Sequence, residues 1–300
     1  MTKTLISVVG PTAIGKTALS IKLAQHFNTE IVSADSRQFY KEMCIGTAVP
    51  SSEELKSAIH HFIQHKSVEE HYTVGDFERD AISVIQKIHK HNSVALMVGG
   101  SGLYVKAVTK GLNDFPEVDN TIRTNLKEAL NTQGLQSLQN RLKTLDPVAY
   151  DTIAIDNPQR VIRALEICLG TNTPYSSFLT NPEKARPFKT IAIGLNAERS
   201  IIYDRINQRV DIMVKNGLIE EAKRLFPLRH LNALNTVGYK ELFQYFEGTY
   251  TLDFAISEIK KNTRRFAKRQ LTWFRKDTSI AWFDYKTATD EIIHYIEDLL

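Results

Sequence analysis

Gly10-Pro11-Thr12-Ala13-Ile14-Gly15-Lys16-Thr17 matches the pattern G-x-x-x-x-G-K-[ST] at every fixed position. An apolar, β-branched run at residues 4–9 precedes this stretch, and an amphipathic run at residues 16–27 follows it. These runs predict a buried strand and a helix, which is the context that the pattern requires. The order strand, loop, helix therefore predicts a phosphate-binding loop at the carboxyl end of a strand.

The chemistry of this loop is that of anion capture. Gly10 and Gly15 allow backbone N–H groups to turn toward a ligand without the steric cost of a Cβ atom. The positive end of the following helix favours bound phosphate. Lys16 adds a charge, and the Thr17 hydroxyl can coordinate Mg²⁺. We therefore expect the whole loop to bind a polyphosphate; an ATP site is the easiest interpretation, although the pattern alone does not identify a nucleotide.

A second strand is predicted at residues 30–34 and ends at Asp35. Strand, helix and strand of this length form a βαβ unit, which implies a parallel sheet with a right-handed crossover. Ligands of open α/β sheets bind beyond the carboxyl ends of the strands, so the loop and Asp35 are expected to face one cleft. Asp35 is then a candidate general base or Mg²⁺ partner. A turn or N-cap aspartate is the alternative interpretation.

Two further strands are predicted, at residues 93–98 and 189–195. The first ends in the glycine-rich turn Gly99-Gly100-Ser101-Gly102, which either lets backbone approach a ligand or is a tight turn without contacts. The second precedes a helix that carries Arg205 and Arg209 four residues apart. These arginines are expected to lie over the phosphates, with plain surface charge as the alternative.

Four histidines fall between residues 60 and 71, namely His60, His61, His65 and His71. We interpret them as loop and surface residues, because no cysteine lies close by and their spacing matches no standard zinc pattern. Asp76 then predicts the N-cap of a helix that runs to about residue 91.

Residues 113–180 have a different texture from the rest of the chain. They show helical patterns without strand alternation, and Gly134 is expected to separate two helices. Pro147 and Pro158 each fit the first turn of a helix, where a missing N–H costs nothing. The fold class predicted is α/β: a P-loop core of parallel sheet, residues 1–112 and 181–300, with a helical insertion at residues 113–180.

The composition bounds the class of protein. The chain has 300 residues, of which 42% are hydrophobic, a net charge of +4 and two cysteines. It contains no apolar run of about 18 residues, which a membrane helix needs, so no membrane partner is expected. The two cysteines build neither a disulfide framework nor a cysteine metal site. These properties predict a cytoplasmic protein.

Residues 260–276 hold eight basic residues and no acid, with Phe266, Trp273 and Phe274 interleaved. Each lysine or arginine that contacts a phosphate releases counterions, so a polyanionic partner is expected. We expect the aromatic residues to pack the helix on the core rather than to stack bases. The residues alone therefore describe either a small-molecule kinase or a phosphate-chemistry enzyme that acts on RNA.

The motifs, taken together, resemble those of the tRNA dimethylallyltransferases, also called tRNA isopentenyltransferases, of the bacterial type. The resemblance spans nearly the whole chain, in blocks at residues 10–17, 35–40, 46–50, 98–106, 156–166, 237–241 and 263–275. The last block, Thr-Arg-Arg-Phe-Ala-Lys-Arg-Gln-Leu-Thr-Trp-Phe-Arg, is long and unusual. Three positions depart from the family pattern: Ser101 replaces Thr, Val49 replaces Lys, and position 37 is Arg.

The resemblance implies a reaction and a ligand for the loop. Members of the family transfer the dimethylallyl group from dimethylallyl diphosphate to N6 of adenosine 37 in tRNA, and the loop holds the diphosphate of that donor. Asp35, at the family's aspartate position, takes a proton from N6, while Lys16, Mg²⁺ on Thr17 and Arg209 stabilise the departing charge. We expect a monomer with dimethylallyl diphosphate and tRNA as partners and Mg²⁺ as cofactor.

The resemblance also implies tRNA contacts and a role for the helical insertion, which clasps the anticodon stem-loop. The residues expected to contact tRNA, including three on the basic helix, are Asp35, Ser36, Arg37, Gln38, Ser101, Arg123, Gln159, Arg160, Val161, Ile162, Arg163, Asn235, Thr236, Val237, Gly238, Tyr239, Lys240, Arg264, Lys268 and Arg269. Alternative functions are prenyl transfer to a free adenine nucleotide, a P-loop small-molecule kinase, and a non-catalytic RNA-binding protein.

Overall fold

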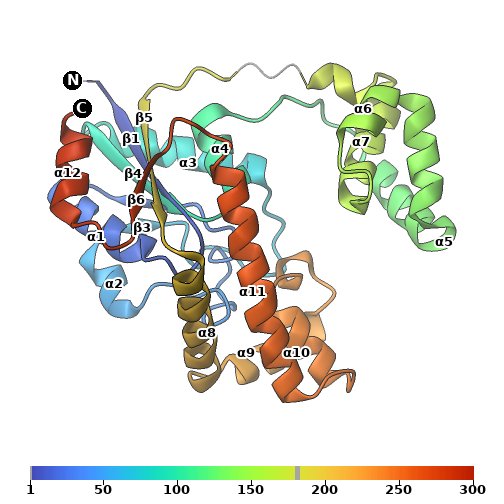
Figure 1. The fold of residues 1–300 in the computed structure, drawn as a ribbon. Helices are drawn as coiled ribbons and strands as arrows, with labels where there is room; N and C mark the ends of the chain where they lie inside the picture. Colours follow the sequence, from blue (N-terminus) through green and yellow to red (C-terminus); the bar gives the residue numbers. More distant parts are fainter. Residues whose placement is uncertain (1, 180–182) are drawn as a thin grey trace. The chain divides into compact units, whose positions relative to one another are not determined.

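The computed structural model describes residues 2–179 and 183–300, which form two compact units (Figure 1). One unit, here called the sheet unit, comprises the chain up to Lys110 together with Ala185–Leu300. The other, the helical unit, is Gly111–Lys184. The boundaries predicted from the sequence, after residues 112 and 180, lie within a few residues of these divisions.

The sheet unit is built on six parallel strands in the order β3-β2-β4-β1-β5-β6. The strands are β1 Thr4–Val9, β2 Ile31–Ser33, β3 His60–His61, β4 Val94–Gly99, β5 Lys189–Asn196 and β6 Ala281–Asp284. All six residues of β1 are buried, as expected for a central parallel strand that is covered on both faces. The predicted α/β class with a parallel sheet is confirmed.

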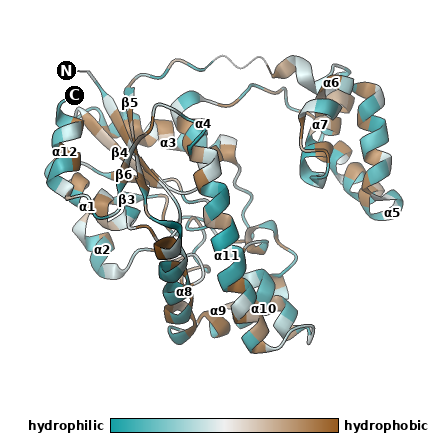
Figure 2. Ribbon diagram, viewed as in Figure 1, coloured by the Kyte–Doolittle hydropathy of each residue, from teal (hydrophilic) through white to brown (hydrophobic). Residues whose placement is uncertain are grey.

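Helices cover both faces of this sheet. The helices of the sheet unit, of which α9 and α10 pack on other helices rather than on the sheet, are α1 Lys16–His26, α2 Ser52–Ser57, α3 Val74–Ile88, α4 Gly102–Lys110, α8 Arg199–Lys215, α9 Leu218–Leu225, α10 Tyr239–Phe246, α11 Leu252–Phe274 and α12 Thr289–Glu297. Successive strand residues point to opposite faces, so Leu5 and Val9 enter one hydrophobic cluster and Ile6 and Val8 enter another. Figure 2 shows that the strands are largely hydrophobic and that α11 is largely hydrophilic.

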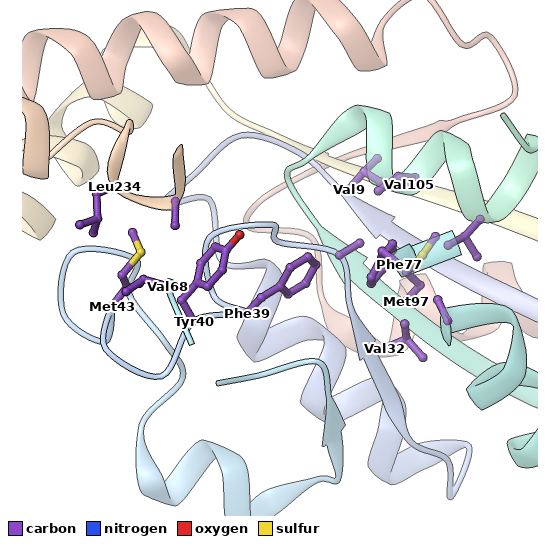
Figure 3. Close-up of a cluster of buried hydrophobic side chains, with 14 of the residues drawn as sticks. Val9, Val32, Phe39, Tyr40, Met43, Val68, Phe77, Met97, Val105 and Leu234 are labelled. Carbon is purple, nitrogen blue, oxygen red and sulfur yellow. The ribbon is translucent and has the colours of Figure 1, made fainter. Parts of the chain in front are cut away.

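The first cluster extends beyond the sheet. In Figure 3, Val9, Val32 and Met97 of the strands lie near Phe77 and Val105 of α3 and α4. The same view shows that side chains after β2 continue the cluster, among them Phe39, Tyr40 and Met43. The segment that follows Asp35 is therefore fixed by its own buried side chains.

Three local predictions need correction. Residues 60–61 were expected to lie in a loop but form the edge strand β3. The edge strand β6 was not predicted at all. Strands of two and four residues are too short to show the period-two alternation by which strands are predicted. Helix α3 is capped by Thr73, not by Asp76. Thr73 Oγ1 accepts the Asp76 N–H, and Asp76 accepts the Thr73 N–H, so Asp76 occupies the third position of a capping box.

The helical unit has a hydrophobic core of its own, formed by α5 Asn120–Leu145, α6 Pro147–Thr152 and α7 Pro158–Thr171. Gly134 interrupts α5 with φ 77° and ψ 171°, as predicted. Asp146 and Asn157 cap the next two helices, and a proline opens each of them, also as predicted. Within the described residues, no helix of either unit is long and apolar enough to cross a membrane.

A buried carboxylate holds the segment beyond Tyr40 in place. Glu221 of α9 is 2% exposed and accepts the backbone N–H groups of Cys44, Ile45 and Gly46. It also accepts the Tyr239 hydroxyl at 2.7 Å. Burial, with the Glu221 carboxylate, raises the pKa of the Tyr239 phenol, which therefore stays protonated and donates.

Removal of this carboxylate is expected to destabilise the sheet unit strongly. Glu221→Ala leaves four buried donors without an acceptor, and we expect it to lower the free energy of unfolding by roughly 3 kcal/mol or more. Tyr239→Phe removes one of these bonds and is expected to cost about 1 kcal/mol. Urea unfolding followed by circular dichroism measures both. Equal losses in the two variants would contradict the account.

Candidate active site

A cavity of about 430 Å³ lies at the carboxyl edge of the sheet. Its wall includes the phosphate loop from Thr12 to Thr17, residues at the ends of β2 and β4, and two arginines of α8. The polar and charged residues that line it are Thr12, Lys16, Thr17, Ser33, Asp35, Gln38, Thr47, Glu54, His60, Arg205, Gln208 and Arg209. The parallel sheet therefore brings the predicted loop, the predicted carboxylate and both predicted arginines together.

The loop has the backbone that anion binding requires. Gly10, Ala13 and Gly15 have φ values of 143°, 63° and 113°, respectively. A Cβ atom at Gly10 would lie 2.6 Å from the Leu195 carbonyl oxygen, so the chain must have glycine here. The Lys16 ammonium donates to the Pro11 carbonyl at 2.7 Å, which holds its long side chain back across the loop.

The cavity destabilises its own positive charges when no anion is bound. Desolvation lowers the pKa of Lys16 to about 8; Asp35 opposes this shift and Arg209 reinforces it. Desolvation also lowers the pKa of Arg209, again against the field of Asp35. The cavity lining holds three cations, Lys16, Arg205 and Arg209, and two carboxylates, Asp35 and Glu54. This surplus of one positive charge is what a bound polyanion can neutralise.

The two arginines of α8 differ in their contacts. The Arg205 guanidinium donates to the Ala13 carbonyl at 2.7 Å and lies 5.4 Å from the centre of the Tyr285 ring. Arg205 therefore supports the backbone of the loop at the cavity wall. Arg209 is less exposed than Arg205. Its charge lowers the pKa of Lys16, and the charge of Asp35 in turn opposes the lowering of the pKa of Arg209. The sequence leaves open which of the two arginines faces the ligand, and this difference favours Arg209.

Asp35 both shapes a turn and lines the cavity. Its Oδ1 atom accepts the Arg37 N–H at 3.1 Å, as in an aspartate turn. In the described parts of the chain, Oδ2 accepts no hydrogen bond, and the side chain lines the cavity. Oδ1 thus shapes the turn, and Oδ2 is available to a ligand.

The glycine-rich turn after β4 contacts the segment after Asp35. The Ser101 hydroxyl accepts the Ser36 N–H at 3.1 Å and lies 3.2 Å from the Ser36 hydroxyl. Gln38 donates from its amide to the carbonyls of Thr47 and Ala48. The turn therefore contacts neighbouring protein groups, and its approach to a ligand stays a prediction.

The structure narrows part of the predicted tRNA contact set. Tyr239 is 0% exposed and donates to Glu221, and Val161 and Ile162 are 0% exposed in the core of the helical unit. Gly238 is buried as well. Core packing occupies the side chains of Val161, Ile162 and Tyr239, and Gly238 has none, so the predicted set is narrowed at these four positions to contacts through the backbone.

Several other predicted contacts are already engaged with protein groups. The Arg37 guanidinium donates to the Asn232 and Ala233 carbonyls, and Arg264 donates to Asn207 Oδ1. Arg123 and Arg163 both donate to the buried Glu166 carboxylate at 3.0 Å. The predicted residues with exposed side chains are Gln159, Arg160, Asn235, Lys240, Lys268 and Arg269.

Helix α11 differs from its prediction in how its aromatic residues lie. Only Phe274 is buried, whereas Phe266 and Trp273 are 38% and 40% exposed. The buried face of the helix follows residues 259, 267, 270 and 274, a helical spacing from which positions 266 and 273 are displaced. The Arg269 guanidinium lies 5.8 Å from the centre of the Phe266 ring, so charge and aromatic surface are exposed together.

Several residues of the site region were missed from the sequence, among them Ser33, Thr47, Glu54 and Gln208 of the cavity wall, as well as His60 and Gln270. His60 lines the cavity from β3, with Nδ1 2.8 Å from the Ala58 carbonyl. Gln270 lies on the buried face of α11 and is 6% exposed. A glutamine at a position where the helical spacing calls for an apolar residue was the signal available for Gln270.

Magnesium would find few protein ligands here. In residues 2–179 and 183–300, no group of three or more histidine, cysteine or acidic side chains could hold a metal. The cavity offers the Thr17 hydroxyl and the Asp35 carboxylate. This sparse oxygen set fits Mg²⁺, which is usually held by one or two protein groups, waters and substrate phosphates.

Comparison with known proteins gives one consistent result. A family model described as IPP transferase matches residues 38–277. The chain is 61% identical over 297 residues to a tRNA dimethylallyltransferase of Christiangramia forsetii, which covers 99% of this chain and 98% of the relative. It is 57% identical over 304 residues to the tRNA dimethylallyltransferase of Flavobacterium johnsoniae, covering 99% and 98%.

Solved structures agree in fold. The tRNA isopentenylpyrophosphate transferase of Bacillus halodurans aligns with a TM-score of 0.72 at 41% identity, over 99% of this chain and 95% of that one. A eukaryotic dimethylallyltransferase crystallised acting on tRNA aligns with a TM-score of 0.82 at 26% identity, over 99% and 79%.

The Lys16 environment predicts how anion affinity depends on pH. A pKa of about 8 means that the free protein loses the Lys16 charge above pH 8, whereas a bound polyanion favours the charged form. Affinity for inorganic diphosphate should therefore be full at pH 7 and fall above pH 8. Calorimetry measures this affinity for the unchanged protein and for Lys16→Arg, whose guanidinium does not titrate in this range. Between pH 7 and pH 9.5 the affinity of the unchanged protein should fall by a factor roughly tenfold larger than that of Lys16→Arg.

Lys16→Arg also serves as the control for titration of diphosphate itself, since both proteins bind the same ligand. Parallel pH profiles for the two proteins would contradict a titrating Lys16.

Proposed function

The chain belongs to the IPP transferase family of tRNA dimethylallyltransferases, and we propose that it transfers the dimethylallyl group from dimethylallyl diphosphate to N6 of adenosine 37 in tRNA. The observation that carries this proposal is the shared cavity of Lys16, Arg209 and Asp35. The two cations suit a diphosphate, and a carboxylate with one free oxygen suits a proton acceptor beside it. Relatives named tRNA dimethylallyltransferase at 61% and 57% identity support the same conclusion.

The loop then holds a leaving group. As the bond between the allylic carbon and the diphosphate oxygen breaks, negative charge builds on the diphosphate. Backbone N–H groups of the loop, Lys16 and Arg209 stabilise that charge in a desolvated site, where such interactions are strongest. Thr17 and Asp35 are the residues that would hold a Mg²⁺ here, and such an ion would supply further charge neutralisation.

Asp35 acts on the acceptor. The N6 amine of adenine is a poor nucleophile because its lone pair is delocalised into the ring. The N6–C1 bond forms as the C1–O bond breaks, and the proton lost from N6 passes to the Asp35 carboxylate. The backbone contact from Arg37 to Asp35 Oδ1 orients the carboxylate so that Oδ2 is the accepting atom.

RNA binding is assigned to the exposed basic and aromatic surface of α11 and to the helical unit. Lys268 and Arg269 are exposed for phosphates, and Phe266 and Trp273 are exposed for unstacked bases. A loop adenosine can be flipped into a cavity at modest cost because it is not paired. Exposed Gln159 and Arg160 start α7 in the helical unit and could hold the stem-loop backbone.

The reaction is tested by incubating the protein with Mg²⁺, dimethylallyl diphosphate and unmodified tRNA, and by locating the added group in RNA fragments by mass spectrometry. We expect a dimethylallyl group on N6 of adenosine 37. Asp35→Asn is expected to lower transfer by roughly a thousandfold while tRNA affinity changes less than about tenfold, because the proton acceptor acts in the transition state.

Other outcomes separate the alternatives. Transfer to AMP but not to tRNA would favour an adenine-nucleotide prenyltransferase, and phosphoryl transfer from ATP would favour a kinase. Full activity of Asp35→Asn would exclude Asp35 as the base.

The basic surface of α11 predicts a salt dependence. Lys268→Ala combined with Arg269→Ala should weaken tRNA binding and reduce the slope of log affinity against log salt by roughly 1.4 to 1.8, since each of the two lost phosphate contacts removes about 0.7 to 0.9. Filter binding over a range of salt concentrations measures this slope. Lys22→Ala with Lys286→Ala, two exposed lysines of α1 and the segment after β6, is the charge-matched control and should leave the slope unchanged. Equal slopes for both double variants would place the RNA elsewhere.

A further inference from the structure

Gln270 joins the two loops that flank the cavity floor. Its Oε1 atom accepts the Thr12 N–H of the phosphate loop at 2.9 Å. Its Nε2 atom donates to the Gly100 carbonyl of the turn after β4, also at 2.9 Å. One side chain of α11 thus bridges the ends of β1 and β4.

The environment of Gln270 is specific for a carboxamide. Thr12 offers a donor and Gly100 an acceptor, so the amide has one orientation and both of its functions are used. A Cβ atom at position 100 would lie 2.2 Å from Gln270 Nε2, so the approach of the side chain depends on glycine there. Because Gln270 is 6% exposed, water cannot readily replace either bond.

Each end of this bridge contacts a loop that we assign to one of the two substrates. Thr12 lines the cavity within the loop assigned to the diphosphate. Gly100 precedes Ser101, which contacts Ser36 next to the proposed base Asp35. Lys268 and Arg269, which precede Gln270 on α11, belong to the proposed RNA surface. The bridge therefore connects the donor loop, the acceptor side and the RNA-binding helix.

The Thr12 N–H donates to Gln270 and is therefore not available to a ligand. The loop N–H groups available to the diphosphate are then those nearer to Lys16 and Thr17. Gln270 consequently fixes the beginning of the loop while the end of the loop binds the anion.

We propose that Gln270 is a positioning residue, which holds the phosphate loop and the Gly100 turn at the spacing that aligns the prenyl donor with the adenine. This inference rests on the proposed function for its kinetic part and on the Thr12 contact for its structural part. A displacement of about 1 Å at reacting groups can cost about a hundredfold in rate, so the effect should appear in kcat.

The test compares Gln270→Met, Gln270→Glu and Gln139→Met. Methionine keeps the length of the side chain without the amide, and glutamate can accept the Thr12 N–H but repels the Gly100 carbonyl. Gln139 is the matched control, because it is 8% exposed and donates its amide to the Ile155 carbonyl within the helical unit. Hydrogen exchange of the Thr12 amide, kcat, KM for dimethylallyl diphosphate and tRNA affinity are measured for each protein.

Pro11 has no amide hydrogen, so Thr12 supplies the first exchanging amide after Gly10. In Gln270→Met we expect Thr12 to exchange about tenfold faster or more, and kcat to fall about tenfold or more, with KM and tRNA affinity within about threefold. In Gln270→Glu we expect a similar loss of kcat with slower Thr12 exchange than in the methionine variant. Gln139→Met should match the unchanged protein in exchange and kcat.

Unchanged Thr12 exchange in Gln270→Met would overturn the proposal, as would unchanged kcat or a kcat loss shared by Gln139→Met. Failure of the unchanged protein to prenylate tRNA would instead refute the proposed function. Even then, the exchange rate of Thr12 in Gln270→Met would decide whether Gln270 holds the loop.

Discussion

Parallel pairing of β1 with β4 on one side and with β5 on the other sets the position of every group in the cavity. Val9, the last residue of β1, is level with Gly99 and with Gly194. The phosphate loop, the glycine-rich turn and the segment that leads to α8 therefore leave the sheet side by side. Asp35 reaches the same edge because β2 pairs with β4. The chemistry of the site follows from this edge, since it collects groups that are distant in sequence.

The electrostatics of the edge favour a polyanion whose charge increases during the reaction. Lys16 and Arg209 are both desolvated, which makes their charged forms costly until an anion binds. Such a site stabilises the charge of a departing diphosphate more than that of an intact donor. Interactions that are stronger in the transition state than in the bound substrate are the ones that accelerate a reaction. The P-loop sequence is most easily interpreted as a nucleotide site. The carboxylate in the same cavity, the basic, aromatic surface of α11 and the names of the relatives favour the ligand that we propose instead, the diphosphate of a prenyl donor.

The strong local patterns predicted most of the fold. The G-x-x-x-x-G-K-T loop with its flanking strand and helix, the break at Gly134 and the proline-opened helices are where the sequence placed them. The errors arose where tertiary contacts decide. Strands β3 and β6 exist only because they pair at the edges of the sheet. Tyr239 belongs to a motif with a polar appearance, yet Glu221 holds it in the core. The role of Gln270 follows from its contacts with Thr12 and Gly100. These residues lie 258 and 170 positions before it in the sequence, so no local pattern could predict the contacts.

The central claim is that the phosphate loop holds a leaving group, so that diphosphate departs intact. Phosphorus NMR of the protein with dimethylallyl diphosphate, unmodified tRNA, Mg²⁺ and added ATP measures this directly. The account predicts one inorganic diphosphate for each adenosine modified, with the ATP signals unchanged and no orthophosphate formed. Orthophosphate or ADP that accumulates in step with RNA modification, or modification without free diphosphate, would contradict it.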